Sequence, residues 1–462
     1  MFITIHIFTV LLLVVRSYQQ ERRLGKFQEV FAWKQLTYNI NGIQLLQDRF
    51  SEDIEEFRSK READRIIFSD DEPNDNTNWS EPEDEAGRFF IQYNNVPMGV
   101  ERVGDRLFIT VPRRRYGIPS TLNYVSLSRD SRTRSPPLRP YPDLARASSL
   151  TSVYRTRADQ CGRLWMVDTG LLEIPGNPQQ VQPPAIVIFD LASNRQILRY
   201  PFKSSDLPAA NTPTGLASIT VDITGSCDFA FAYVPDLTTY GLIVYSLKDN
   251  NSWRLTHNYF YFNPLAGNLR ISGNFQWSDG IFSITLTEPG ADGCRTAYFH
   301  PLASTQEFSV STCVLQNSSI SSQSDYYRLY SVSLSLSTDE NGLSCLPRWP
   351  SADCLLNVYI SYFNKKNTRY LLSDLHVTND EVWVMSNTLP RFGYSTLDTN
   401  EYNFYIYRCV SRMQYFLQLI KKLRVSQRAM ERAMCGQYTI RSQTQHSRAP
   451  LTPLSAGFRF AP

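Results

Sequence analysis

The chain has 462 residues, which is enough for one large domain or for two to three ordinary ones. Hydrophobic residues make up 42% of it and aromatic residues 13%, so the chain can bury a full core. A formal net charge of +3 is too small to indicate a nucleic-acid-binding protein.

The first residues, "MFITIHIFTVLLLVVRSYQQ", contain a short apolar core from Ile7 to Val15. This core is too short to span a bilayer, and the small residues that follow predict a signal peptide over 1–17, cleaved after Ser17. No later run reaches 18 apolar residues, so we expect a secreted, extracellular protein with no stable membrane span. Eight cysteines fit an oxidising compartment, as do glycosylation sequons at Asn78, Asn250 and Asn317.

Two blocks of charge interrupt the chain. Residues 52–85 are rich in Asp and Glu, and we interpret them as an acidic insertion. After Glu401 the chain has a single acid, Glu431, against ten Lys or Arg residues, which predicts a basic C-terminal tail over 411–462. Five apolar residues of the tail fall on one helical face and predict an amphipathic helix, packed on the main domain or, alternatively, docked on a membrane surface or partner: Met413, Phe416, Leu417, Ile420 and Leu423.

Between these blocks the chain contains short segments rich in aromatic and β-branched residues, each bounded by Gly, Asp, Asn or Pro, and these predict β-strands. Two kinds of segment recur. One kind is "RLFITVP", "RLWMVDTG", "GIFSITL" and "EVWVMSN", and the other is "AIVIFDL", "GLIVYSL" and "NFYIYRC". Trp165 and Phe189 are 24 residues apart, and so are Trp383 and Tyr407. Many short strands of two alternating kinds predict an all-β fold, a β-propeller.

Longer blocks carry a family resemblance over about Lys26 to Arg408. They include "NNVPMGVERVGDRLFITVPRRRYGIPSTLNYV", "QCGRLWMVDTG", "CDFAFAYVPDLTTYGLIVYSL" and "VWVMSNTLPRFGYSTLDTNEYNFYIYR". In these blocks the chain resembles the insect Yellow and major royal jelly protein family. The resemblance implies a secreted six-bladed β-propeller over 18–410, with the segment "FQEVFAWKQLTYNI" contributing to ring closure. A C-terminal helical extension would follow it. The resemblance fades between Asn317 and Asn357, where we nevertheless expect a blade.

The resemblance also implies disulfide pairs. Cys161 and Cys227 match two family positions and would join neighbouring blades. Cys354 is the counterpart of another family cysteine and would pair with Cys409 or Cys435, with Cys345 as an extra cysteine. The two that remain, Cys294 and Cys313, are placed to pair across the hairpin that contains "YFHPLA".

The sequence contains few motifs that indicate catalysis or cofactor binding. The histidines of the body, His257, His300 and His376, have no metal-binding spacing, and no phosphate-binding glycine loop or serine-hydrolase motif occurs, so we expect neither a metal nor a cofactor. A propeller channel lined with aromatics is suited to a small aromatic amine or catechol-type ligand. The residues expected to contact it, most of them at strand ends, are Asp168, Tyr233, Asp236, Asn274, Phe275 and Asn387.

Two functions stay open at this point. The first is a binding or structural factor of cuticle pigmentation and melanisation that handles dopa-derived compounds, with cuticle components as possible partners. The second is an enzyme that isomerises dopachrome, which some relatives are thought to do. That reaction needs one well-placed base, and Asp236 and His257 are weak candidates. A third reading, a metal-dependent propeller enzyme, would need carboxylates and amides that converge on a divalent ion, and no spacing singles them out.

Overall fold

The computed structural model describes residues 27–50, 88–173, 176–209, 212–270, 274–276, 278–304, 306–320, 323, 325–335, 371–378 and 381–410. Five four-stranded antiparallel sheets account for most of its strands. Each sheet is one blade, so the described residues form a β-propeller with five blades.

The five blades follow one another along the chain, each with four strands in sheet order. The first is β6 (Gly99–Val103), β7 (Arg106–Thr110), β8 (Leu122–Ser126) and β9 (Arg139–Pro140). The second is β10 (Val153–Ala158), β11 (Arg163–Asp168), β14 (Ala185–Asp190) and β15 (Arg195–Pro201). The third is β16 (Thr220–Ile223), β17 (Ala230–Asp236), β18 (Gly241–Ser246) and β19 (Asn251–Thr256). The fourth is β22 (Ile281–Leu286), β23 (Thr296–Pro301), β24 (Gln306–Ser311) and β25 (Ser331–Ser335). The fifth is β26 (Leu371–Thr378), β27 (Glu381–Asn387), β28 (Phe404–Val410) and β1 (Gln28–Trp33).

Short elements connect the blades. Four two-strand ribbons are β2 (Tyr38–Ile40) with β3 (Ile43–Leu45), β4 (Arg49–Phe50) with β5 (Arg88–Phe90), β12 (Leu171–Leu172) with β13 (Gln179–Gln180), and β20 (Asn268–Arg270) with β21 (Asn274–Gln276). The α-helices are α3 (Leu144–Ala147), α4 (Thr312–Leu315) and α6 (Leu389–Tyr394). The 3₁₀ turns are η2 (Gln92–Asn94), η3 (Ser204–Asp206), η4 (Asn258–Phe260), η5 (Pro264–Ala266) and η7 (Tyr326–Leu329).

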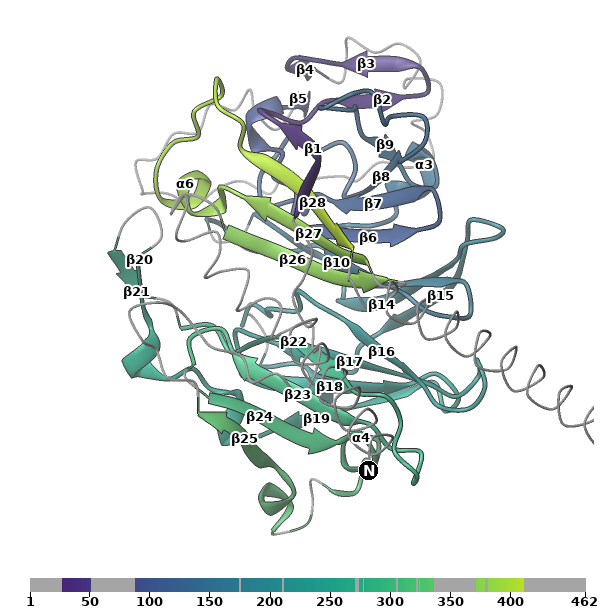
Figure 1. Cartoon of the computed structure of the whole chain (residues 1–462), viewed down its shortest axis with the longest axis vertical. Coiled ribbons are helices and arrows are strands. Elements are labelled where there is room, and N and C mark those ends of the chain that lie inside the picture. The colour runs from purple at the N-terminus through teal and green to yellow at the C-terminus, as the bar shows by residue number, and fades with distance from the viewer. Residues whose placement is uncertain are drawn as a thin grey trace, which may run out of the picture. The chain divides into compact units, whose positions relative to one another are not determined.

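The fifth blade joins the two ends of the described chain. β1 lies antiparallel to β28, with Trp33 opposite Phe404 and Gln28 opposite Arg408 (Figure 1). The indole N–H of Trp33 also donates to the carbonyl of Pro136, 2.8 Å away, beside the first blade. The expected role of the N-terminal segment in closure is therefore confirmed.

The two recurring kinds of segment are the central strands of the blades. In the second blade "RLWMVD" forms β11 and "AIVIFD" forms β14, and the two pair along their whole length from Arg163 opposite Asp190 to Asp168 opposite Ala185. Both are buried at nearly every position, because each face packs on a neighbouring blade. One segment departs from this pattern: "GIFSITL" forms β22, the first strand of its blade.

Apolar side chains of successive blades pack into shared clusters. Trp165 of the second blade and Tyr245 of the third belong to one such cluster, and both are fully buried. Trp383 of the fifth blade shares another with Val100 of the first. Burying one large side chain of this kind stabilises the fold by about 1.5–3 kcal/mol, so packing between blades is the main source of stability.

The expectation of six blades is wrong, because the described residues form five. It assumed that the divergent stretch from Asn317 to Asn357 makes a blade of its own. Its first part instead supplies β25, the last strand of the fourth blade, which pairs with β24. The signal peptide, the acidic insertion over 52–85 and the helix expected after Ser411 lie outside the described residues.

Among the described residues, first strands of different blades contact one another. β6 contacts both β10 and β26, and β16 contacts β22. We call β6, β10, β16, β22 and β26 the inner strands. The fourth strand of a blade, such as β19, then lies at the opposite edge of its sheet, three strand spacings or about 14 Å away.

Candidate functional site

Charged side chains face one another across three inner strands. β6 contributes Glu101, β10 contributes Arg155 and Arg157, and β26 contributes Asp374 and His376. Side chains two residues apart in a strand lie on the same face, so β10 and β26 each present two polar groups to the same side. We call these five residues the inner-strand cluster.

Glu101 is the most deeply buried member of this cluster. Its side chain is 1% exposed, with Oε1 2.9 Å from Nε2 of His376 and Oε2 3.6 Å from Nη1 of Arg157. Neither oxygen accepts a hydrogen bond of good geometry from the described residues. A buried carboxylate in this condition is costly and calls for an explanation beyond packing.

The partners of His376 define its tautomer. Nη1 of Arg157 contacts Nδ1 of the ring, and because an arginine donates and does not accept, Nδ1 is the acceptor. The ring proton is thereby assigned to Nε2, which faces Glu101. The arrangement is an acid, an imidazole and a guanidinium in a row, with Arg157 as its most exposed member.

Arg155 and Asp374 brace the strands that carry this row. Nε of Arg155 donates to the carbonyl of Ser373 at 2.9 Å and lies 3.5 Å from Oδ1 of Asp374. Oδ2 of Asp374 accepts the backbone N–H of Val100 at 2.9 Å, which ties β26 to β6. The Arg155 guanidinium also lies 5.4 Å from the centroid of the Phe282 ring, on the inner strand β22.

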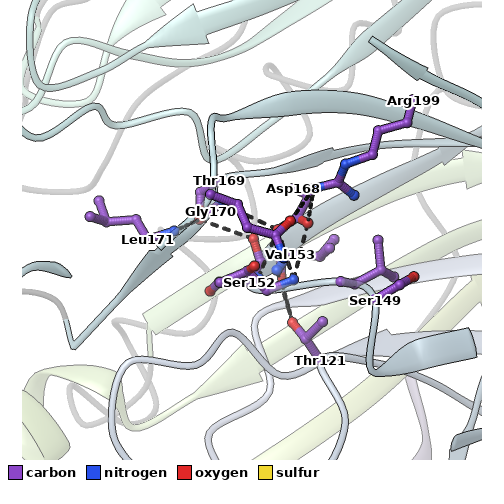
Figure 2. Close-up of polar contacts among 12 residues, drawn as sticks. Thr121, Ser149, Ser152, Val153, Asp168, Thr169, Gly170, Leu171 and Arg199 are labelled. Atoms are coloured by element: carbon purple, nitrogen blue, oxygen red, sulfur yellow. Dashed lines mark hydrogen bonds and ion pairs between the residues drawn. The ribbon is translucent and has the colours of Figure 1, made fainter. Parts of the chain in front are cut away.

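Asp168, predicted to contact a ligand, ends β11 with a fully buried side chain. Its carboxylate accepts the backbone N–H groups of Thr151 and Ser152 at 2.8–3.0 Å, and Nη2 of Arg199 lies 2.9 Å from Oδ2 (Figure 2). These bonds fasten the end of β11 to the start of β10 and to β15. The carboxylate is therefore saturated by the protein, and its role in ligand binding stays a prediction.

Asp236 and Tyr233, on β17, are held in the same way. Oδ2 of Asp236 lies 3.1 Å from Nη1 of Arg254. The Tyr233 hydroxyl donates to Asp222 at 3.2 Å and accepts from Nε2 of Gln316 at 2.9 Å. Burial raises the pKa of Tyr233 well above its usual range. Asp236 is 1% exposed, which does not favour it as a base that touches a ligand.

The other predicted contacts lie elsewhere. Asn387 ends β27, where Nδ2 donates to the carbonyl of Pro97 at 2.8 Å. Asn274 and Phe275 belong to β21, which pairs with β20. No hydrogen bond or ion pair joins any two of the four predicted residues whose side chains are described: Asp168, Tyr233, Asp236 and Asn387.

His257, the second weak candidate for a base, follows β19 at the outer edge of its blade. Its Nδ1 accepts the N–H of Tyr259 at 3.0 Å, and its ring stacks on Tyr330 with centroids 4.2 Å apart. Burial lowers the pKa of His257. It lines a pocket of about 430 Å³ that lies away from the inner strands.

Two disulfides connect described elements. Cys161 is bonded to Cys227, which joins the second blade to the third, and Cys294 is bonded to Cys313 beside the hairpin of β23 and β24. These are the pairings expected from the sequence. Cys345, Cys354 and Cys435 lie outside the described residues, as does the sequon at Asn78. The other two sequon residues, Asn250 and Asn317, are exposed.

Sequence reasoning predicted none of the five residues of the inner-strand cluster as site residues. The signal was present as charges two residues apart inside otherwise strand-like segments, in "VYRTRA" for β10 and in "SDLHV" for β26. Such charges on a strand flanked by other strands predict partners across the sheet. The missing step was knowing which strands are neighbours, since Glu101 and His376 are 275 residues apart.

Two kinds of feature do not occur in the described part of the chain. No helix among the described residues is long and apolar enough to cross a membrane. Within the same residues, no group of three or more His, Cys, Asp or Glu side chains is placed to hold a metal ion.

Known proteins resemble this chain over most of its length. A family model described as "Major royal jelly protein" matches residues 151–415. A Drosophila melanogaster protein named "L-dopachrome tautomerase yellow-f" is 42% identical over 350 residues, which cover 69% of this chain and 80% of the relative. "Protein yellow" of Drosophila subobscura is 36% identical over 430 residues, which cover 86% of this chain and 68% of the relative.

Proposed function

Because this chain belongs to the major royal jelly protein family, we propose that it is a secreted pigmentation protein that binds dopa-derived compounds at the inner-strand cluster. The observation that carries the proposal is the row of Glu101, His376 and Arg157 across three blades. A buried acid that accepts no hydrogen bond of good geometry, beside an imidazole whose Nδ1 contacts the partly exposed Arg157, is placed to respond to a ligand.

The charges of the cluster select the ligand. Arg157 has a planar fork of donors that matches a carboxylate, so a ligand with a carboxylate, such as dopa, has a partner that dopamine lacks. Phe282, on the inner strand β22 of the fourth blade, lies near the Arg155 guanidinium and offers a ring face for a catechol or an indoline.

Conversion of dopachrome is the second candidate function, favoured by the relative named as a dopachrome tautomerase and by the Glu101–His376 pair. Tautomerisation to a dihydroxyindole carboxylate moves two protons, one from the carbon that bears the carboxylate and one from the neighbouring ring CH2, to the two quinone oxygens, with no net oxidation. When Arg157 turns to a ligand carboxylate, Nδ1 of His376 is freed to take the carbon-bound proton. Glu101 then stabilises the imidazolium through Nε2, and the imidazolium returns a proton to oxygen.

The test is a calorimetric titration of the purified protein with dopamine, serotonin, dopa and dopachrome. Saturable heat at one equivalent is expected with dopa. Continuous heat with dopachrome, absent from denatured protein, supports conversion. Glu101→Gln should weaken either signal about tenfold or more, because it removes the charge behind the imidazole. Arg102→Ala is the matched control, since Arg102 adjoins Glu101 in β6 but pairs with Glu381, 3.3 Å away. No heat with any compound, or equal losses in both variants, contradicts the proposal.

A further inference from the structure

The pocket that His257 lines lies at the outer edge of the third blade. It has a volume of about 430 Å³, within the range of small-molecule sites. Its walls come from the end of β19 with η4 and from the start of η7. The lining residues are Thr256, His257, Asn258, Tyr259, Tyr261, Tyr326 and Tyr327. We call it the rim pocket.

The walls of the rim pocket are fixed by contacts that span 70 residues of sequence. Nε2 of His257 lies 3.3 Å from the carbonyl oxygen of Tyr327, and the Tyr326 hydroxyl donates to the carbonyl of Thr256. The ring of Tyr259 stacks on Phe308 with centroids 4.2 Å apart. The pocket is therefore preorganised, which lowers the cost of ordering it around a ligand.

Two of the tyrosine rings in the rim pocket are exposed to solvent. Tyr261 and Tyr327 are each 51% exposed. Tyr261 stacks on Tyr240 with centroids 4.3 Å apart, so its plane is held although half of its surface is open. Exposed aromatic surface that is both clustered and held in place is a feature of binding sites.

The side chains that line the rim pocket carry no net charge. Its side chains are a threonine, an asparagine, four tyrosines and one histidine. Burial lowers the pKa of His257, so the ring is uncharged at pH 7. Arg328, next to the pocket, donates from Nε to the Tyr327 hydroxyl at 3.3 Å. A cationic amine meets no counter-ion among these residues, whereas a neutral polyhydroxylated ring is matched by tyrosine faces and by hydroxyl and amide groups.

We propose that the rim pocket binds a neutral hexopyranose oligosaccharide. The apolar face of a sugar ring would stack on Tyr261 or Tyr327, and its hydroxyls would exchange hydrogen bonds with Asn258 and the tyrosine hydroxyls. This site is separate from the inner-strand cluster and does not depend on the function proposed for that cluster. The candidate ligands share a β-linked hexose chain and differ in whether their rings carry acetamido groups.

The experiment titrates the full secreted chain with cellotriose and with chitotriose, followed by calorimetry. Saturable binding of either sugar is expected, and the preferred sugar identifies whether acetamido groups are recognised. Tyr261→Ala and Tyr327→Ala should each weaken binding about tenfold, because each removes one stacking face. Tyr261→Phe should retain most of the affinity, which separates stacking from a general loss of structure.

Two controls keep the result specific. Leu265→Ala changes a side chain that is 92% exposed, lies near the pocket in sequence and does not line it, so affinity should not change. Arg157→Ala should leave sugar binding intact, which distinguishes failure of this site from failure of the inner-strand site. The proposal is overturned if neither sugar saturates, if both tyrosine variants bind as well as the wild type, or if a proline-rich peptide binds at these tyrosines and the sugars do not.

Discussion

Two buried carboxylates of this protein have opposite surroundings. Asp168, at the end of β11, accepts backbone N–H groups and pairs with Arg199. Glu101, in the middle of β6, accepts no backbone N–H group of the described residues, and its two buried oxygens face side chains instead, Nε2 of His376 at 2.9 Å and Nη1 of Arg157 at 3.6 Å. The contacts of Asp168 are those of a residue that stabilises the fold. The contacts of Glu101 are those of a residue in a ligand-binding site. Burial alone does not distinguish them, but the number of donors does.

The largest expected effect is on stability, at the saturated acid. Asp168→Ala removes the acceptor of several buried N–H groups and leaves Arg199 without its partner. We expect the free energy of unfolding to fall by about 3–5 kcal/mol in urea titrations. Asp168→Asn retains one acceptor oxygen and should lose less. A change below about 1 kcal/mol in Asp168→Ala would mean that the carboxylate does not fasten β11.

A smaller loss of folding stability is expected when Arg199, the partner of Asp168, is replaced. Arg199→Ala deletes a guanidinium that is 27% exposed, and Asp168 keeps its backbone donors. Solvent screens part of the pair, so the expected loss is about 1–3 kcal/mol in the same unfolding assay. If this variant lost more stability than Asp168→Ala, the backbone bonds would not be the main anchor.

The unsaturated acid should behave differently. Glu101→Gln keeps an acceptor oxygen toward Nε2 of His376, and the wild-type carboxylate holds no backbone N–H group, so the free energy of unfolding should fall by less than it does in Asp168→Asn. Thermal and urea unfolding measure this directly, and Asp168→Asn is the matched replacement of acid by amide. A loss in Glu101→Gln as large as that in Asp168→Asn would remove the distinction between the two acids.

The smallest expected effect is a pH dependence of the free energy of unfolding, which arises from His257 in the rim pocket. The pKa of His257 is lower in the folded protein than the unfolded value of about 6.5, so the unfolded chain binds more protons between the two values. Its contribution to stability is complete above about pH 6.5 and is lost as the pH falls through the folded pKa. The His257 ring packs on the rings of Tyr259, Tyr326 and Tyr330.

This dependence is measured by comparing unfolding of the wild type and His257→Gln between about pH 7 and pH 5. The wild type should lose more stability than the variant on acidification. Identical pH profiles would show that His257 does not carry the effect.

The sequence predicted the strands well because their signals are local. Aromatic and β-branched composition with turn punctuation identified "RLWMVD" and "AIVIFD", which pair as β11 and β14. The role of the N-terminal segment followed from the family resemblance and is realised by β1 on β28. The blade count failed because it was carried over from the family resemblance, and the strand pattern itself does not fix how many blades form; Ser331 begins β25, which completes the fourth blade.

The site was less accessible to sequence reasoning. Strand ends were chosen as ligand contacts, but a carboxylate that follows a strand is also well placed to accept the N–H groups of the next turn, as Asp168 does. The residues that do converge lie on strands from the first, second and fifth blades. Their meeting depends on which blades are neighbours, and no local pattern encodes that.

The central claim is that Arg157 and the Glu101–His376 pair recognise a carboxylated dopa derivative. Dopa and dopamine differ by one carboxylate, so their relative affinities for wild type and Arg157→Ala test the claim most directly. The wild type should bind dopa more tightly than dopamine, and Arg157→Ala should bind the two alike. A wild type without this preference, or a variant that keeps it, would contradict the account.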